Sequence, residues 1–243
     1  MPALRPYHRD LSYSYAPGFF PCMEALKKRP DSVSRVLVHS KAESSDILPE
    51  LLALCRERSI RVETADRALA RISQKDNVFA AAVFAKQEHP LQKDSNHLVL
   101  YHPGDKGNLG TILRTALGFQ FLNMAVILPA ADLHDPQVVR ASMGALFSMR
   151  VQSFTCFEDY HAAYPEHALY PFMLQASIPL DEAAANAVSP FALIMGNEGA
   201  GLPAEYLTLG QPVRIPHNPA IDSLNLAVAA SIGMYAFSKK HNI

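Results

Sequence analysis

The C-terminal fifty residues constrain this chain most, because they contain two buried-strand patterns that each lead into an unusual loop. Phe191–Met195 is an apolar run that ends in a glycine-rich turn, GNEGAG. Val213–Ile215 is a second apolar run, and a long helix is expected to open at Ser223. The carboxyl ends of strands in open α/β sheets are where ligands bind. The pattern therefore predicts an α/β fold with a site at these two loops.

The turn itself carries three glycines around Asn197 and Glu198. Glycines leave out the Cβ atom, so main-chain groups can approach a ligand closely. An ordinary turn with a glycine at the end of a helix is the alternative interpretation. The spacing is GxxGxG rather than the GxGxxG of dinucleotide sites, and the P-loop lysine is missing. Neither NAD nor ATP is favoured, and a nucleotide-dependent oxidoreductase is disfavoured.

Composition indicates an ordinary globular protein, with 49% hydrophobic and 19% charged residues in 243. The longest apolar run, Val78–Ala85, is far shorter than the ~18 residues that indicate a membrane span. The first residues lack the apolar core of a signal peptide. Cys22, Cys55 and Cys156 are odd in number and widely spaced, which argues against a disulfide framework or a zinc site. We expect a cytoplasmic protein without a membrane segment or a metal.

Charge is distributed unevenly between the two halves. Residues 1–94 carry 15 Lys and Arg against 12 Asp and Glu, whereas residues 95–243 carry 7 against 11. A basic front half is a weak indication of a polyanionic partner. Solvated helix faces explain so small an excess at least as well.

The front half alternates strands and helices at short spacing. The expected elements are helix Pro21–Lys28, strand Arg35–His39, helix Ser45–Arg58 with Ser45 as its N-cap, strand Arg61–Thr64, helix Ala65–Ile72 and strand Val78–Ala85. Residues 87–96 are polar, contain a proline and have the composition of a linker. The sequence therefore predicts two domains, residues 1–94 and 95–243.

The second domain has longer helices between its strands. The expected elements are strand Leu98–Tyr101, helix Leu109–Phe119, strand Met124–Leu128, helix Asp135–Phe147, and strands Val151–Phe154 and Tyr170–Leu174. This alternation predicts a parallel sheet with helices on both faces.

Asn108 and Arg114 lie six residues apart at the start of the first of these helices. That is nearly two helical turns, so they can meet only if the loop folds back or a second subunit supplies one of them. Taken alone, an N-capping asparagine and a surface cation account for both residues.

Three segments together resemble a known family. NLGTILRTALGF (Asn108–Phe119), LIMGNEGAGLP (Leu193–Pro203) and IPHNPAIDSLNLAVAASI (Ile215–Ile232) are similar, in order and spacing, to the three signature motifs of the SpoU/TrmH branch of the SPOUT methyltransferases. RASMGALFSM (Arg140–Met149) resembles the family's helix between the first two motifs. The front half, from Pro17 onward, is similar to the L30e-like substrate-binding domain of many members.

The resemblance implies an enzyme that moves the methyl group of S-adenosylmethionine onto a ribose 2′-hydroxyl of RNA. It also implies a deep C-terminal trefoil knot, a homodimer and no metal. Ribosomal RNA is favoured over transfer RNA because the front domain resembles that of members that modify rRNA. The alternative is a non-catalytic RNA-binding protein that keeps the knotted fold, and the intact motifs argue against it.

The resemblance also implies roles for individual residues. The catalytic set would be Asn108, Arg114, Glu198, Ser223 and Asn225, and the cofactor would be held around Gly196, Ile215 and Leu224, with Ala176 near the adenosine. The family assigns Arg114 to activating the ribose hydroxyl, but a guanidinium stays protonated in proteins. We expect Arg114 to anchor an RNA phosphate and to stabilise developing negative charge. The chain departs from the family at HPGDKG before the first motif and at His217, where methionine is usual.

Overall fold

The computed structural model describes residues 4–72 and 78–240. The chain divides into two compact units that do not follow one simple cut in the sequence. One unit combines Met1–Gln87 with Asp132–Ser148, and the other combines Glu88–Ala131 with Met149–Ile243. No helix in the described ranges is long and apolar enough to cross a membrane.

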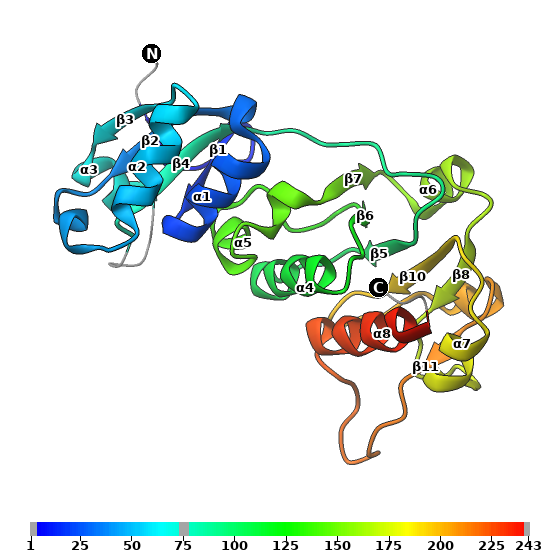
Figure 1. Ribbon diagram of the computed structural model, residues 1–243. Coiled ribbons are helices and arrows are strands. Elements are labelled where there is room, and N and C mark those ends of the chain that lie inside the picture. Colours follow the sequence, from blue (N-terminus) through cyan, green and yellow to red (C-terminus); the bar gives the residue numbers. More distant parts are fainter. Residues whose placement is uncertain (1–3, 73–77, 241–243) are drawn as a thin grey trace. The chain divides into compact units, whose positions relative to one another are not determined.

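The front unit contains a mixed four-stranded sheet in the order β1-β4-β2-β3 (Figure 1). Its elements are β1 (Tyr13–Pro17), α1 (Phe19–Lys28), β2 (Val33–Val38), α2 (Leu48–Glu57), β3 (Arg61–Thr64), α3 (Asp66–Ile72) and β4 (Ala80–Ala85), with 3₁₀ helices at Pro30–Ser32 and Ser40–Ser44. The strand β4 runs antiparallel to β1 and β2, and it is buried along almost its whole length. A continuous apolar strand is expected in such a central position.

The sequence predicted Ser45 as the N-cap of α2, and this prediction is wrong. A 3₁₀ helix ends at Ser44, and α2 begins four residues later at Leu48 with Pro49 in its first turn. Proline favours the first turn of a helix because its missing N–H needs no partner there. The expected strand at Arg61–Thr64 is confirmed at the same bounds.

The segment Asp132–Ser148 packs within the front unit, although in sequence it lies well beyond residue 94, where the front domain was expected to end. It forms α5 (Pro136–Ala141), which contacts β1, and the 3₁₀ helix η3 (Ala145–Ser148), which contacts α1. The ring of Phe147 lies 4.9 Å from that of Phe84, and its carbonyl accepts a hydrogen bond from Arg29 at 2.9 Å. This segment is therefore part of the front unit's core.

The single helix predicted over Asp135–Phe147 is wrong, because the helix breaks at Met143 and Gly144. Both residues have positive φ, 54° and 83°. A Cβ on Gly144 would lie 2.8 Å from Cβ of Glu24 in α1, so a larger residue does not fit there. Residues in the left-handed backbone conformation commonly end helices. Here they change the direction of the chain, so that the following 3₁₀ helix packs against α1.

The rear unit is built on a five-stranded parallel sheet in the order β7-β6-β5-β10-β8, which confirms the predicted α/β class. Its strands are β5 (His97–Tyr101), β6 (Asn123–Ile127), β7 (Arg150–Phe154), β8 (Ala168–Pro171) and β10 (Phe191–Met195), with β9 (Ile178–Pro179) paired to β11 (Val213–Arg214). Its helices are α4 (Lys106–Gly118), α6 (Phe157–Ala163), α7 (Leu180–Asn186), the 3₁₀ helix η4 (Ala204–Thr208) and α8 (Leu226–Lys240).

Helices cover both faces of this sheet, as predicted. On one face, Tyr160 of α6 and Tyr206 of η4 belong to the same buried cluster as Ile194. On the other face, Phe237 of α8 packs on Phe191 at 5.1 Å. The helices α4 and α8 lie side by side (Figure 1). Both carry family-like motifs, so this packing brings the first and third motifs together.

Two helix starts in this unit differ from the expectation. The helix α4 begins at Lys106, three residues early, and its N-cap is Asp105, whose Oδ1 accepts from Asn108 N–H at 2.7 Å. Asn108 is therefore not the cap, and its side chain is available for other contacts. The helix α8 begins at Leu226 rather than at Ser223. Ser223 and Leu224 thus belong to the loop before it.

Candidate active site

Glu198 joins the loop after β10 to the loop after β5. Its Oε2 accepts from Gly104 N–H at 3.0 Å, and its Oε1 accepts from Asp105 N–H at 3.0 Å. Burial alone would raise the pKa of Glu198, but these hydrogen bonds to the charged form outweigh burial and lower it. Glu198 is therefore ionised at neutral pH, and its charge holds two loops at the carboxyl edge of the sheet.

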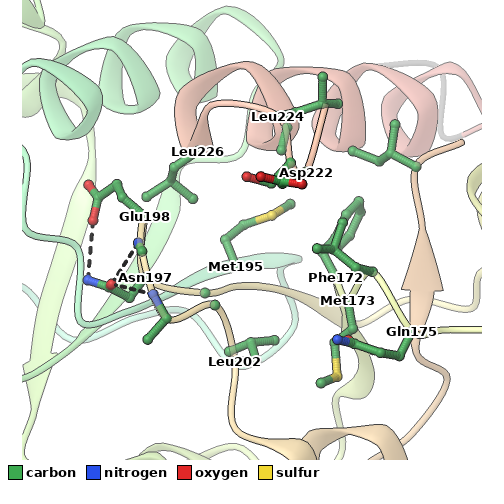
Figure 2. Close-up of a pocket in the computed structure, with 18 of the residues that line it drawn as sticks. Phe172, Met173, Gln175, Met195, Asn197, Glu198, Leu202, Asp222, Leu224 and Leu226 are labelled. Carbon is green, nitrogen blue, oxygen red and sulfur yellow. Dashed lines mark hydrogen bonds between the residues drawn. The ribbon is translucent and has the colours of Figure 1, made fainter. Parts of the chain in front are cut away.

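Asn197 holds the shape of the same loop, a role that sequence reasoning missed. Its Nδ2 donates to the carbonyl of His102 at 2.8 Å. Its Oδ1 accepts from Gly199 N–H at 2.9 Å and from Ala200 N–H at 3.0 Å (Figure 2). An asparagine that bonds the backbone two residues on is typical of tight turns. That preference was the one signal in the sequence that pointed to this residue.

Gly196 is required by the loop's own packing. A Cβ at this position would lie 2.4 Å from the carbonyl carbon of Gly201 and 2.5 Å from the nitrogen of Leu202. Two hydrogen bonds between Asn197 and Gly201 close the loop, with N···O distances of 3.1 and 3.0 Å. The glycine-rich turn is therefore a tight hairpin, in which the backbone of Gly196 packs directly against the backbone of Gly201 and Leu202.

Asn108 connects all three motif segments. Its Nδ2 donates to Oε1 of Glu198 at 3.3 Å, and its Oδ1 accepts from Nδ2 of Asn225 at 2.9 Å. Asn225 also caps α8, because its Oδ1 accepts from Ala227 N–H at 2.9 Å. The side-chain amide of Asn108 is thus occupied at both ends, and a chain of hydrogen bonds runs from Glu198 to the start of α8.

The two other residues of the expected catalytic set lie outside this chain of hydrogen bonds. Arg114 is exposed on α4, and no hydrogen bond or ion pair links its side chain to the described residues. Ser223 is exposed as well and lines a pocket beside the network. Three of the five side chains are therefore brought together, Ser223 lies nearby, and Arg114 is free to meet a partner.

The pocket has a volume of about 310 Å³ and lies between the hairpin after β10, the loop before α8 and the segment after β8. Gly196, Ile215 and Leu224, which were expected around the cofactor, all line it. Ala176 is buried in the core cluster, and its neighbour Gln175 reaches the pocket wall instead.

The lining fits S-adenosylmethionine, which combines a flat aromatic base, suited to apolar walls, with a polar, charged tail. Figure 2 shows Met195 at the centre of the pocket, with Leu202 on one side and Asp222 on the side nearest α8. The loop backbone offers further polar groups. Within residues 4–72 and 78–240, the pocket included, no group of three or more His, Cys, Asp and Glu side chains could hold a metal ion.

His217 also lines the pocket and is half-buried. Its Nδ1 lies 2.9 Å from the carbonyl oxygen of Ile215, which can only accept, so Nδ1 carries the proton. His217 thus ties its own side chain to the backbone of the loop after β11.

Comparison with known proteins agrees with this geometry. The family model described as "SpoU rRNA Methylase family" matches residues 95–235, and the model described as "RNA 2'-O ribose methyltransferase substrate binding" matches residues 15–88. The first match covers the pocket and all three motifs, and the second covers most of the front unit.

Individual relatives match over most of the chain. The 23S rRNA (adenosine(1067)-2'-O)-methyltransferase of Streptomyces laurentii is 30% identical over 90% of this chain and 86% of its own length. The solved SpoU methyltransferase AviRb from Streptomyces viridochromogenes, in complex with the cofactor AdoMet, is 25% identical with a TM-score of 0.77, covering 95% of this chain and 91% of that one. A structure described for the 2-OH methylation of C/U34 on tRNA covers only 62% of this chain but 99% of its own, with 27% identity and a TM-score of 0.56. The chain therefore belongs to the SpoU rRNA methylase family.

Proposed function

We propose that this protein transfers the methyl group of S-adenosylmethionine to a ribose 2′-hydroxyl of RNA. The observation that carries the proposal is the pocket of about 310 Å³, which the second and third motif segments line together with the segment after β8. It lies beside the hydrogen bond that Asn225 donates to Asn108. Family membership and the AdoMet-bound relative support the choice of cofactor.

The chain's residues act by holding and positioning. When bound, the cofactor would supply an electrophilic methyl group on a sulfonium sulfur. The backbone of Gly196, Ile215 and Leu224 would hold it in the pocket. Glu198, through its bonds to the loop after β5, keeps the hairpin of the second motif against α4. Correct placement of the acceptor oxygen supplies much of the rate in such transfers.

Arg114 anchors RNA in this proposal. Its side chain is exposed and has no partner among the described residues, and a guanidinium binds phosphate through paired hydrogen bonds. It stabilises the negative charge that develops on the 2′-oxygen as the hydroxyl proton passes to solvent water, and it is not the acceptor of that proton, because a guanidinium has no free site to take one. Single-turnover rates over a range of pH test this role. A rate that tracks a deprotonation only when Arg114 is present would contradict it.

Ribosomal RNA is the substrate we infer. The S. laurentii relative, named as a 23S rRNA enzyme, matches across both units, whereas the structure described for tRNA matches only 62% of this chain. We assign RNA capture to residues 1–94 and catalysis to residues 95–243. The segment Asp132–Ser148 is the exception within the second range, because it packs in the front core and therefore belongs with the capture unit.

Three further properties belong to the proposal. We infer a homodimer in which a second copy completes the site, a trefoil knot formed by the C-terminal helix, and a cytoplasmic location. The exposed Val228 and Tyr235 on α8 are compatible with a subunit interface. The free thiols of Cys22, Cys55 and Cys156 are compatible with a reducing compartment.

Methyl transfer from labelled S-adenosylmethionine tests the proposed function directly. The protein is incubated with rRNA and tRNA from a strain that lacks it, and the labelled nucleotide is identified after digestion. Label on a ribose 2′-oxygen of rRNA is expected. Label on tRNA alone would show that the substrate is tRNA and not rRNA. RNA binding without transfer, under conditions where the cofactor binds, would favour the non-catalytic RNA-binding alternative.

A further inference from the structure

The charges on the pocket wall are of one sign. Glu198 and Asp222 are the carboxylates among its described lining residues, and no lysine or arginine lines it in the described part of the chain. His217 is the one other ionisable side chain among them. Two carboxylates outnumber the one histidine, so the lining carries net negative charge whether or not His217 holds a second proton.

Asp222 is the carboxylate that is free to act on a ligand. Both oxygens of Glu198 are occupied by main-chain N–H groups of Gly104 and Asp105, with further bonds from Asn108 and Asn197. Asp222 has no hydrogen bond or ion pair with any described residue. In Figure 2 it lies beside Leu224, on the side of the pocket nearest α8. A ligand in the pocket thus meets one uncompensated carboxylate.

The donor and the product of methyl transfer differ by one unit of charge. S-adenosylmethionine has a sulfonium, an ammonium and a carboxylate, so its net charge is +1. Loss of the methyl group converts the sulfonium to a neutral thioether, so S-adenosylhomocysteine has no net charge. A carboxylate within several ångströms favours the cation over a neutral ligand of nearly the same shape.

We propose that Asp222 is a specificity-determining residue that makes the pocket prefer the positively charged donor to its neutral product. This inference rests on the proposed function. Because Asp222 is exposed, solvent screens its field, and the preference it adds is roughly three- to tenfold. Methyl transfer therefore lowers the affinity of the pocket for the ligand it holds, because the cationic donor becomes the neutral product. The product then dissociates, and a new donor molecule binds in its place.

Calorimetric titration of the full chain tests this inference without measuring activity. Dissociation constants are determined for S-adenosylmethionine, S-adenosylhomocysteine and sinefungin, which carries an ammonium group in place of the sulfonium. In Asp222→Asn, affinity for the two cationic ligands is expected to fall roughly three- to tenfold, with affinity for S-adenosylhomocysteine within twofold. Asp222→Glu should retain the preference. The matched control Glu205→Gln removes an exposed carboxylate of η4 that does not line the pocket, and it should change nothing.

Several results would overturn the inference. An unchanged preference in Asp222→Asn would contradict it while leaving the proposed function intact, and so would an equal loss for all three ligands, because that indicates a role in pocket shape. If the unaltered protein bound none of the three, both the proposed function and this inference would fail. Weaker discrimination at high salt would support the electrostatic origin.

Discussion

The side-chain amide of Asn225 donates to Oδ1 of Asn108 across 2.9 Å, although the residues are 117 positions apart in sequence. Asn108 in turn donates to Glu198, so one chain of hydrogen bonds joins all three motif segments. Residues that the family resemblance groups as catalytic therefore hold one another in place. The other two residues of that set lie outside the chain of hydrogen bonds and are exposed: Ser223 at the pocket and Arg114 on α4.

Replacing Asn225 by alanine should destabilise the protein. The substitution removes the cap of α8 and the partner of Asn108, and lost caps cost about 1 kcal/mol. We expect a loss of roughly 1–2 kcal/mol in the free energy of unfolding, measured with urea, and weaker binding of S-adenosylhomocysteine. The matched variant Asn218→Ala breaks only a turn bond to Ala220 N–H in an exposed loop and should cost less. Equal effects of the two substitutions would count against the network.

Gly196→Ala and Gly199→Ala should behave very differently. A Cβ at 196 lies 2.4 Å from backbone of Gly201, whereas one at 199 lies 3.6 Å from Oδ1 of Asn197, an ordinary contact. Overpacking of this kind costs roughly 1–3 kcal/mol or opens the hairpin. We expect Gly196→Ala to lose cofactor binding in calorimetry and Gly199→Ala to retain it. Retention by both would show that the loop is not constrained by this contact.

Arg114→Ala should separate transfer from cofactor binding. Removing a group that stabilises transition-state charge typically costs 100-fold or more, on the order of 3 kcal/mol. Because the exposed side chain of Arg114 does not line the pocket, affinity for S-adenosylhomocysteine should stay within about twofold. Arg114→Lys should recover part of the rate, since it keeps the charge but not the planar fork. Equal loss of transfer and binding in Arg114→Ala would end this division of roles.

Stability should fall as pH is lowered from about 6.5 to about 4. His97 is fully buried, and burial lowers its pKa from 6.5 to about 4, helped by His167 and opposed by a hydrogen bond to the carbonyl of Gln92. Between these values the unfolded chain binds the extra proton, so stability rises with pH in this window. His97 alone contributes a loss of roughly 3 kcal/mol by pH 4. Urea unfolding of His97→Gln should show a flatter pH dependence, and an unchanged slope would refute the assignment.

A chain that begins at residue 95 should fold poorly. Val138, Val139 and Phe147 are buried, and the elements that carry them pack on β1 and α1. Without the front unit these side chains face water, at a cost of roughly 1.5–3 kcal/mol each. Dye binding and gel filtration beside the full chain should reveal exposed apolar surface and association. A shortened chain that is monodisperse and equally stable would show that Asp132–Ser148 has no need of the front unit.

Much of the fold could be predicted because the strands are short, continuous apolar runs. Arg61–Thr64 and Phe191–Met195 are found at the expected bounds, and the parallel sheet follows from their alternation with helices. The strand β1 and the helices α6 and α7 were not predicted, because segments of five to seven residues hold too little periodicity. The packing of Asp132–Ser148 in the front unit is a non-local contact, which periodicity does not report.

The site was predictable in part for a different reason. The motif resemblance located Glu198, Asn108 and Asn225, but it could not say that their polar groups bind one another. The N-cap of α4 fell on Asp105 rather than Asn108, and aspartate and asparagine have similar capping preferences. Asn197 had only the turn preference of asparagine to mark it in the sequence, and its contacts became clear from the hydrogen bonds of the hairpin. Asp222 was given no role by the resemblance and was found only through the lining of the pocket.

Calorimetric titration of the purified protein with S-adenosylmethionine tests the central claim most directly. S-adenosylhomocysteine is measured alongside it, and NADH serves as the control for a nucleotide of another class. We expect the two adenosyl compounds to bind at one site per chain and NADH not to bind, and we expect Gly196→Ala to abolish the binding. Binding of NADH in preference to both adenosyl compounds, or adenosyl binding unaffected by Gly196→Ala, would contradict it.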